Sequence, residues 1–343
     1  MSAEWRLLRD GITDAHQHFA LEEAILRLLD EGRSPPTLRL RQVQRAAFIG
    51  VFQDTWSEVD VDFCRRHGIA IVRRANGGGA VYHDLGSFCY SAFFPRSAFA
   101  QSDEELARLF AQPVIRTCAD YGLEAHFSGR NDVVVGGRKI YGCAQVAWYG
   151  AFAQSGTFLV NMDFGVMEQV LTPPALKFAG TPGASVSQRV TSLERELGHS
   201  VDVDEAMARF TAHFSRLFSI QLLPGALTEA ERELGHHLWK AKYSTDAWNL
   251  GSPRASGAAL SIKTSVGVVS LSAELTPEGV LRSVRISGDL LLNNAAALAE
   301  VERALVGRPP EGAASFVRGA LPDPELAEAL VELLGQLSAQ GPG

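Results

Sequence analysis

One stretch of this sequence reads Arg73-Arg-Ala-Asn-Gly-Gly-Gly-Ala-Val-Tyr-His-Asp84, and a second, Gly136-Gly-Arg-Lys-Ile-Tyr-Gly142, follows it later in the chain. Three consecutive glycines after two arginines allow backbone amides to approach an anion closely. Lys139, a lone lysine in an apolar strand pattern, can supply one more positive contact. The two stretches together suggest a site for an activated acyl phosphate.

The glycine run does not fit the common nucleotide-binding motifs. A dinucleotide-binding GxGxxG opens a helix, and a P-loop GxxxxGK[ST] carries a lysine directly after its last glycine. Here the glycines lie between predicted strands at 69–73 and 88–94 and lack that lysine. A purely structural turn would also use glycine. The neighbours Arg74, Asn76 and His83 favour a site, because donors and a titratable ring converge there as they would around a carboxylate and a phosphate.

A polar turn, Ser128-Gly-Arg-Asn-Asp132, precedes the lysine stretch. Oxygens of Asn131 and Asp132 suit Mg²⁺ or a nucleotide. Arg138 and Lys139 alternate on a predicted strand, so only one of them can face the interior. Taken alone, that pair is typical of a solvated strand, and the polar turn is what favours a site role for Lys139.

Length and composition describe an ordinary globular chain of 343 residues with 46% hydrophobic and 21% charged residues, long enough for two domains. A net charge of −7 argues against a general nucleic-acid or membrane-surface role. The cysteines at 64, 89, 118 and 143 form no CxxC, which argues against a zinc knuckle or a secreted disulfide framework. With no apolar leader and no long apolar run, we expect a cytoplasmic protein.

Hydrophobic periodicity predicts an α+β fold. A helix with one apolar face begins after Asp14, which can cap it. In the next strand Leu38 and Leu40 alternate with Arg39 and Arg41, which predicts a half-exposed strand. Further strands are expected at 46–52, 69–73, 88–94, 133–135, 140–148 and 157–161, and helices at 57–67, 103–121, 207–217 and 230–242.

The later strands should form an antiparallel meander with a turn at 150–154. Pro113 should end one helix and start another. Residues 172–188 are rich in Pro, Gly, Ser and Thr, which predicts a long mobile loop with a functional role. A break in periodicity sets a domain boundary near Gly251, followed by two or three strands and two helices.

Several segments occur in one order: His18-Phe-Ala-Leu-Glu-Glu23, the glycine stretch, Gly129-Arg-Asn-Asp132, Gly137-Arg-Lys-Ile-Tyr-Gly142, Gly156-Thr157, Arg189-Val190, Tyr243-Ser-Thr-Asp-Ala-Trp-Asn249 and Ile286-Ser-Gly-Asp289. This order resembles the lipoate-protein ligases, members of the superfamily of biotin/lipoate ligases and octanoyltransferases. The match runs from about His16 to about Leu292 and is more specific than any single motif.

The resemblance implies a catalytic domain at 1–250 with mixed and antiparallel sheets, and a small α+β accessory domain at 251–343. Arg73 to Gly79 resembles the lipoate-binding loop, Lys139 the catalytic lysine that contacts the acyl adenylate, and Lys177 to Arg189 the adenylate-binding loop. Asn131 and Asp132 match the nucleotide and Mg²⁺ side. The implied lipoate- and adenylate-binding residues are Arg73, Arg74, Asn76, Gly77, Gly78, Gly79, Tyr82, His83, Asn131, Asp132, Gly142, Gln154, Gly156, Thr157, Lys177, Ser185 and Arg189.

The implied reaction uses ATP, Mg²⁺ and lipoate. Lipoate and ATP give lipoyl-AMP and pyrophosphate, and a lysine of an acceptor lipoyl-domain protein then takes the lipoyl group. From the net charge we expect no nucleic-acid and no membrane partner, and we expect a monomer.

Four residues depart from the family pattern, His18, Asn76, Ser87 and Gln154, and Cys143 stands where the ligases usually carry a small polar residue. A thiol beside Lys139 could serve as a nucleophile, which leaves open an octanoyl or lipoyl transferase that forms a thioester on Cys143. A third possibility is a catalytically silent protein that binds lipoate or lipoyl-AMP.

Overall fold

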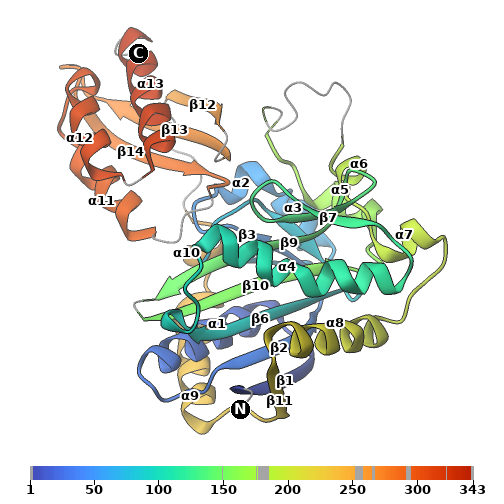
Figure 1. The fold of residues 1–343 in the computed structure, drawn as a ribbon. Helices are drawn as coiled ribbons and strands as arrows, with labels where there is room; N and C mark the ends of the chain where they lie inside the picture. Colours follow the sequence, from blue (N-terminus) through green and yellow to red (C-terminus); the bar gives the residue numbers. More distant parts are fainter. Residues whose placement is uncertain are drawn as a thin grey trace.

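The computed structural model describes residues 3–148, 150–174, 176, 185–251, 258–264, 267–290, 295–321 and 323–340. Three sheets organise this part of the chain (Figure 1). The strand orders are β11-β1-β2-β6-β10-β9-β8-β7 in the largest sheet, β4-β3-β5 in the second and β12-β13-β14 in the third. Mixed and antiparallel sheets combined with helices confirm the expected α+β fold.

The large sheet is formed by β1 (Ala3–Thr13), β2 (Thr37–Val43), β6 (Ser87–Pro95), β7 (Ala125–Ser128), β8 (Asp132–Val135), β9 (Arg138–Trp148), β10 (Ala151–Leu159) and β11 (Ile220–Pro224). Strand β1 pairs in parallel with β2 and β11, and the remaining pairs are antiparallel. The meander β8-β9-β10 is confirmed. The turn expected over 150–154 is wrong, because β10 begins at Ala151 and pairs with β6 without a break while Phe152 packs into the core.

Helices cover both faces of the large sheet. On one face α4 (Asp103–Asp120) packs Phe110 against Phe94 of β6, and α8 (Val203–Phe218) packs Phe214 against Phe110. On the other, α1 (Ala15–Asp30) packs Ile25 against Phe93. Among the described residues up to 251, further helices are α2 (Thr55–Glu58), α3 (Val61–Arg66), η1 (Arg96–Ala98), α5 (Phe164–Val170), α6 (Val186–Arg189), α7 (Leu193–Leu197), α9 (Glu229–Leu238), the π-helix η3 (Trp239–Tyr243) and α10 (Asp246–Asn249).

Pro113 lies inside α4 and does not divide it, so the expectation of two helices is wrong. A proline inside a helix removes one backbone hydrogen bond. The Tyr90 hydroxyl donates to the nearby Phe110 carbonyl at 3.0 Å, and Pro113 itself is buried against the core. Tertiary packing therefore keeps the helix continuous.

Strand β2 differs most from its expectation. Arg39 and Arg41 are 0% and 2% exposed, so the strand is buried on both faces and not half exposed. The reason lies outside the strand, because carboxylates of Asp10 and Glu22 meet the two guanidinium groups. Ion pairing satisfies charges that alternation alone would place in solvent.

The second sheet positions the glycine stretch. Its strands are β3 (Ala46–Ile49), β4 (Ala70–Arg73) and β5 (Val81–His83), so the strand expected at 46–52 ends three residues early. Parallel pairing of β3 with β4 and antiparallel pairing with β5 place residues 74–80, here called the glycine loop, at one end of this sheet.

The C-terminal part has three strands, β12 (Ala258–Thr264), β13 (Gly267–Leu275) and β14 (Leu281–Gly288). Against them pack α11 (Ala295–Leu305), η4 (Pro310–Ala313), α12 (Ala314–Ala320) and α13 (Pro324–Gln340), one α-helix more than expected. This core also takes in Phe52, whose carbonyl accepts from the Gly288 amide at 2.9 Å. A division into domains near Gly251 stays a prediction.

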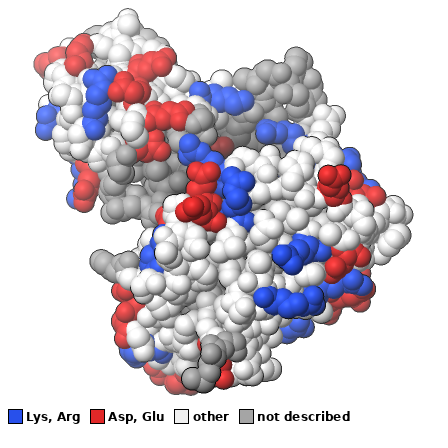
Figure 2. All heavy atoms as spheres, in the orientation of Figure 1, with Lys and Arg blue, Asp and Glu red and all other residues white. Residues whose placement is uncertain are grey.

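Acidic and basic side chains are interspersed on the face shown in Figure 2, so that face carries no field of a single sign. Within the described residues, no helix combines the length and the hydropathy needed to span a bilayer.

Candidate functional site

A cavity of about 590 Å³ lies where the glycine loop, the β8–β9 hairpin and helix α1 meet. Residues Gly267 and Asp289 of the C-terminal part also line it. The predicted site residues on its wall are Arg74, Asn76, Gly77, Gly78, Gly79, Tyr82, His83, Asn131, Asp132, Lys139, Gly142, Gly156, Thr157 and Arg189. The fold thus brings together segments that lie far apart in the sequence.

Arg74 holds the glycine loop from within. Its guanidinium donates to the carbonyls of Phe48, Gly77 and Gly79 at 3.2, 2.7 and 2.9 Å. Burial, together with the neighbouring charge of Arg73, lowers the pKa of Arg74 to about 10. The guanidinium still carries its charge at neutral pH, and its N–H groups donate hydrogen bonds to backbone carbonyls of the glycine loop and of β3.

The glycines permit a close approach by the C-terminal part. The Gly78 amide donates to the Leu290 carbonyl at 2.8 Å, and a Cβ on Gly77 would overlap that same oxygen. Gly78 has φ of 91°, a conformation that favours glycine. One of the loop amides predicted to face an anion is therefore engaged by the C-terminal part.

Lys139 and Asp132 form an ion pair on the cavity wall, with Nζ 2.7 Å from Oδ1. Both side chains are about one-third exposed, at 30% and 32%. Gly142 makes this position of the lysine possible, because a Cβ there would lie 2.5 Å from Cε and Nζ of Lys139. Next to the pair, the Asn131 side-chain amide donates to the Cys143 carbonyl at 2.8 Å, which ties the residue before β8 to strand β9.

His83 contributes a neutral ring. It is 1% exposed and stacks on Phe48 with ring centroids 4.0 Å apart. Burial, aided by the charges of Arg74 and Arg41, lowers the pKa of His83 to about 3. At neutral pH the imidazole is uncharged, so it can offer hydrogen bonds and shape but no ionic contact.

Four predicted residues do not appear on the cavity wall. Arg73 donates to the carbonyls of Gly50 and Gln53 at 3.0 and 2.6 Å, and so it braces the loop that follows β3. Gln154 is fully buried within the sheet, where its Oε1 accepts from Gln145 at 2.8 Å. Ser185 is the N-cap residue of α6. Lys177 lies outside the described residues, as does most of the loop expected over 172–188, whose end forms α6.

Cys143 lines the cavity and is 5% exposed. Burial raises the pKa of its thiol to about 11. The thiol is therefore protonated at neutral pH, and a thiol is a far weaker nucleophile than a thiolate.

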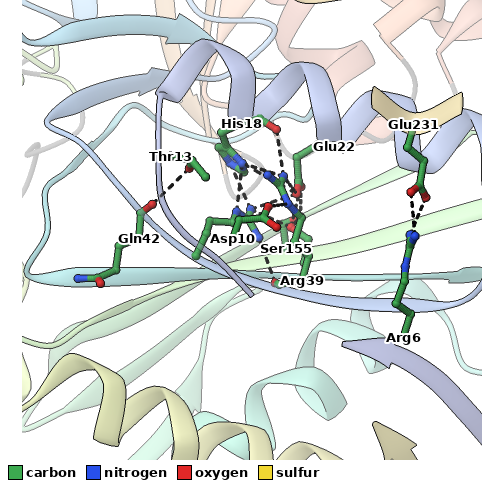
Figure 3. Close-up of polar contacts among 11 residues, drawn as sticks. Arg6, Asp10, Thr13, His18, Glu22, Arg39, Gln42, Ser155 and Glu231 are labelled. Atoms are coloured by element: carbon green, nitrogen blue, oxygen red, sulfur yellow. Dashed lines mark hydrogen bonds and ion pairs between the residues drawn. The ribbon is translucent and has the colours of Figure 1, made fainter. Parts of the chain in front are cut away.

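Sequence reasoning missed the polar residues at the inner end of the cavity, which are shown in Figure 3 with the side chains behind them. His18 and Glu22 of α1, Arg41 of β2 and Ser155 of β10 line the cavity there. The sequence marks His18 as part of the first family segment and as a departure from the family pattern, but it predicts no role for His18 in the site. The sequence signal for this buried polar cluster was the presence of two arginines, Arg39 and Arg41, in a strand whose other residues are typical of a core.

The described residues contain no group of three or more His, Cys, Asp and Glu side chains arranged to hold a metal ion. Mg²⁺ is commonly held by one or two carboxylates together with substrate phosphates. Asp132 offers one such carboxylate on the wall, so the donor set fits that mode of binding and not a cage made of protein alone.

The family model for the lipoyl protein ligase A/B catalytic domain matches residues 14–215. Lipoate-protein ligase A subunit 1 of Thermoplasma acidophilum is 31% identical over 71% of this chain and 95% of its own length. Lipoate-protein ligase LplJ of Bacillus subtilis is 30% identical over 87% of this chain and 88% of its own. Octanoyltransferase LipM of Symbiobacterium thermophilum is 30% identical over 73% and 99%.

Solved structures agree in fold. A lipoate-protein ligase A bound with ATP superposes with a TM-score of 0.64 at 30% identity, over 72% of this chain and 99% of the other. The bipartite lipoate protein ligase of Thermoplasma acidophilum, studied with its E2 lipoyl domain, gives 0.63 at 30% identity over 75% and 100%. Plasmodium falciparum LipL1 with lipoate gives 0.74 at 18% identity over 97% and 99%, which shows the shared fold. The chain therefore belongs to the lipoyl protein ligase A/B catalytic-domain family.

Proposed function

We propose that this enzyme activates lipoate with ATP and transfers the lipoyl group to a lysine of a lipoyl-domain protein. The observation that carries the proposal is the Lys139–Asp132 pair on the wall of the same cavity as the glycine loop. Similar proteins are named lipoate-protein ligases, one similar structure holds ATP, and another was studied with an E2 lipoyl domain.

In the first half-reaction a carboxylate oxygen of lipoate attacks the α-phosphorus of ATP. The new P–O bond forms as the bond to pyrophosphate breaks, and negative charge grows on the α-phosphate oxygens. The Lys139 ammonium stands on the wall where it can offset that charge, and a preorganised cation of this kind stabilises the transition state most strongly where water is excluded. Amides of the glycine loop add donors from the other side.

When bound to the nucleotide phosphates and to Asp132, Mg²⁺ would offset charge on the leaving pyrophosphate. Asn131 stands next to Asp132, and its side-chain amide is already directed to the Cys143 carbonyl. The side-chain oxygen of Asn131 then remains for the nucleotide side of the site.

In the second half-reaction the neutral ε-amine of the acceptor lysine attacks the acyl carbonyl, the amine nitrogen gives up one proton to solvent as the amide forms, and AMP leaves with the electron pair of the broken C–O bond. Lys139 can again offset charge, now on the departing phosphate. The neutral imidazole of His83 adds no positive charge there that would repel the acceptor's cationic side chain before it loses its proton.

A transferase that uses a Cys143 thioester is the second candidate, because a LipM octanoyltransferase is as similar as the LplJ ligase. Cys143 does line the cavity. Its raised pKa, about 11, speaks against that role, since catalytic cysteines have lowered values.

The test is to incubate the full chain and a lipoyl domain with lipoate, ATP and Mg²⁺ and to measure the mass of the acceptor. We expect an ATP-dependent lipoyl adduct that disappears with Lys139→Ala. The exposed Lys240 in η3 provides a matched control, since Lys240→Ala removes a lysine that does not line the cavity.

Acceptor modification that needs an acylated carrier protein in place of ATP, and that is lost in Cys143→Ser, would replace the ligase with the transferase. Absence of modification from either donor would favour a silent binding protein.

A further inference from the structure

The inner end of the cavity is polar and deeply buried, unlike the outer end near Lys139. His18, Glu22, Arg41 and Ser155 line it. The side chains of His18 and Arg41 are each 2% exposed, whereas that of Lys139 is 30% exposed. An acyl chain whose carboxylate lies near Lys139 would therefore extend its far end toward charged groups.

Formal charges at this end are balanced. Arg39 pairs with Asp10 at 2.5 Å and with Glu22 at 2.9 Å (Figure 3). Arg41 pairs with Glu22 at 3.2 Å. Hydroxyls of Ser91 and Ser155 donate to the second carboxylate oxygen of Glu22 at 2.6 and 3.3 Å. A further full charge would have no partner here, so a neutral group suits the cluster better than a carboxylate.

Hydrogen-bond donors are in excess around His18. Arg41 Nε donates to its Nδ1 at 3.1 Å, Arg39 Nη1 lies 3.2 Å from the same ring nitrogen, and Arg41 Nη2 lies 3.2 Å from its Nε2. Guanidinium nitrogens can only donate. The nearest carboxylate oxygen, on Glu22, is 4.0 Å from Nδ1 and too distant for a hydrogen bond.

Burial and the two arginines hold the pKa of His18 well below its usual value, so the ring is neutral with one N–H. Because Nδ1 accepts from Arg41, that hydrogen lies on Nε2, and the polar contact of Nε2 within the described residues is a guanidinium nitrogen of Arg41 at 3.2 Å, which cannot accept it. Behind it, Nη2 of Arg39 is also buried without a hydrogen-bond partner among the described residues. The cluster therefore contains buried hydrogen-bond donors that have no acceptor among the described residues. In folded proteins almost all buried polar groups have a hydrogen-bond partner.

We propose that the inner end of the cavity binds an oxygen acceptor on the distal part of the acyl chain. The acid that this enzyme activates best would then be a medium-chain carboxylic acid with a hydroxyl or carbonyl oxygen far from its carboxylate. This inference rests on the proposed acyl activation and specifies its substrate class. A hydrocarbon end would leave the His18 N–H unpartnered, and sites built to bond a polar substrate group discriminate strongly against the analogue that lacks it.

The first test uses the unmodified chain and compares octanoate, lipoate and 6-, 7- and 8-hydroxyoctanoate in ATP–pyrophosphate exchange. We expect at least one hydroxy acid to exceed octanoate in kcat/KM by about tenfold or more. Sulfur is a weak acceptor, so lipoate should fall between them. A preference for octanoate or lipoate over all three hydroxy acids overturns the inference while leaving the proposed adenylation intact.

A second measurement separates this inference from the proposed function. Binding of the same acids is followed by calorimetry without ATP. If the hydroxy acid binds more tightly than octanoate but no acid supports exchange, the inference stands and the adenylation proposal fails. Binding of none of the acids, with no exchange, overturns both.

The variant His18→Phe removes both ring nitrogens at similar volume. We expect the preference for the hydroxy acid over octanoate to fall to about twofold or less. His16→Phe, on the same helix but not lining the cavity, should keep the original ratio. An unchanged ratio in His18→Phe overturns the role of His18.

Discussion

A methyl group at Gly142 should displace Lys139 with little effect on the fold. The added Cβ of Gly142→Ala would lie 2.5 Å from Cε and Nζ of Lys139. Non-bonded heavy atoms prefer separations of roughly 3.5–4.0 Å, so the ammonium must move by about 1 Å or more. Because these atoms end a flexible side chain that is 30% exposed, the lysine can swing away without straining the core.

Misplacing a reacting or charge-stabilising group by about 1 Å can cost ~10²-fold in rate. We therefore expect lipoate-dependent ATP–pyrophosphate exchange to fall by about 10²-fold in Gly142→Ala, with the melting temperature nearly unchanged. Gly165→Ala is the matched control, since Gly165 lies exposed in α5 with room for a methyl group.

The decisive comparison comes from introducing Gly142→Ala into the Lys139→Ala variant. If Gly142 acts only through the lysine, the double variant loses no more exchange than Lys139→Ala alone, which should lose ~10²–10³-fold. Near-normal exchange in Gly142→Ala, beside a disabled Lys139→Ala, would refute the claim that the position of Nζ matters. A large drop in melting temperature would show instead that the fold could not accommodate the methyl group.

Three further predictions follow from buried groups. Cys143→Ser should retain ATP-dependent lipoylation within a few fold, and alkylation of Cys143 in the original chain should accelerate only as the pH approaches its pKa of about 11; fast alkylation at pH 7 would contradict the buried thiol. Arg73→Ala removes several buried hydrogen bonds to backbone carbonyls and should lower the unfolding free energy by roughly 3 kcal/mol, measured by urea denaturation; a loss below about 0.5 kcal/mol would argue against the bracing role. The pKa of His83 is about 3 in the folded chain against 6.5 as its ordinary value, so the unfolded state binds the proton first as pH falls below 6.5. His83 should therefore cost up to about 1.4 kcal/mol of stability per pH unit between pH 6.5 and pH 3, and His83→Gln should show a shallower slope over that window; equal slopes would contradict the buried neutral ring.

Local patterns were enough to predict the glycine loop between strands, the β8–β9–β10 meander and the cap at Asp14, because turn and cap chemistry act within a few residues. Patterns failed where a distant segment changed the outcome. Alternation placed Arg39 in solvent, yet Asp10 and Glu22 arrive from elsewhere to neutralise it. Strand β1 and its neighbour, the edge strand β11, were not predicted, because much of their surface stays polar and exposed.

The candidate site likewise has a part that the sequence predicted and a part that depends on contacts between distant segments. The fold gathers most of the residues implied by the family resemblance around one cavity, since ordered motifs fix relative position along a shared fold. The resemblance could not distinguish a residue that faces the cavity from one that holds its wall, and Arg73 belongs to the second kind. Nor could it reveal the donors around His18, which depend on the rotamers of residues on α1 and β2.

The hydrogen bond from the Gly78 amide to the Leu290 carbonyl also has a thermodynamic meaning. A single N–H has one hydrogen to give, so a ligand oxygen that takes it must displace that carbonyl. Occupancy of the loop and docking of the C-terminal part are then linked equilibria, and each weakens the other by the same factor. Mobility of residues 267–290 measured against ligand concentration would report the affinity of the loop without any catalytic turnover.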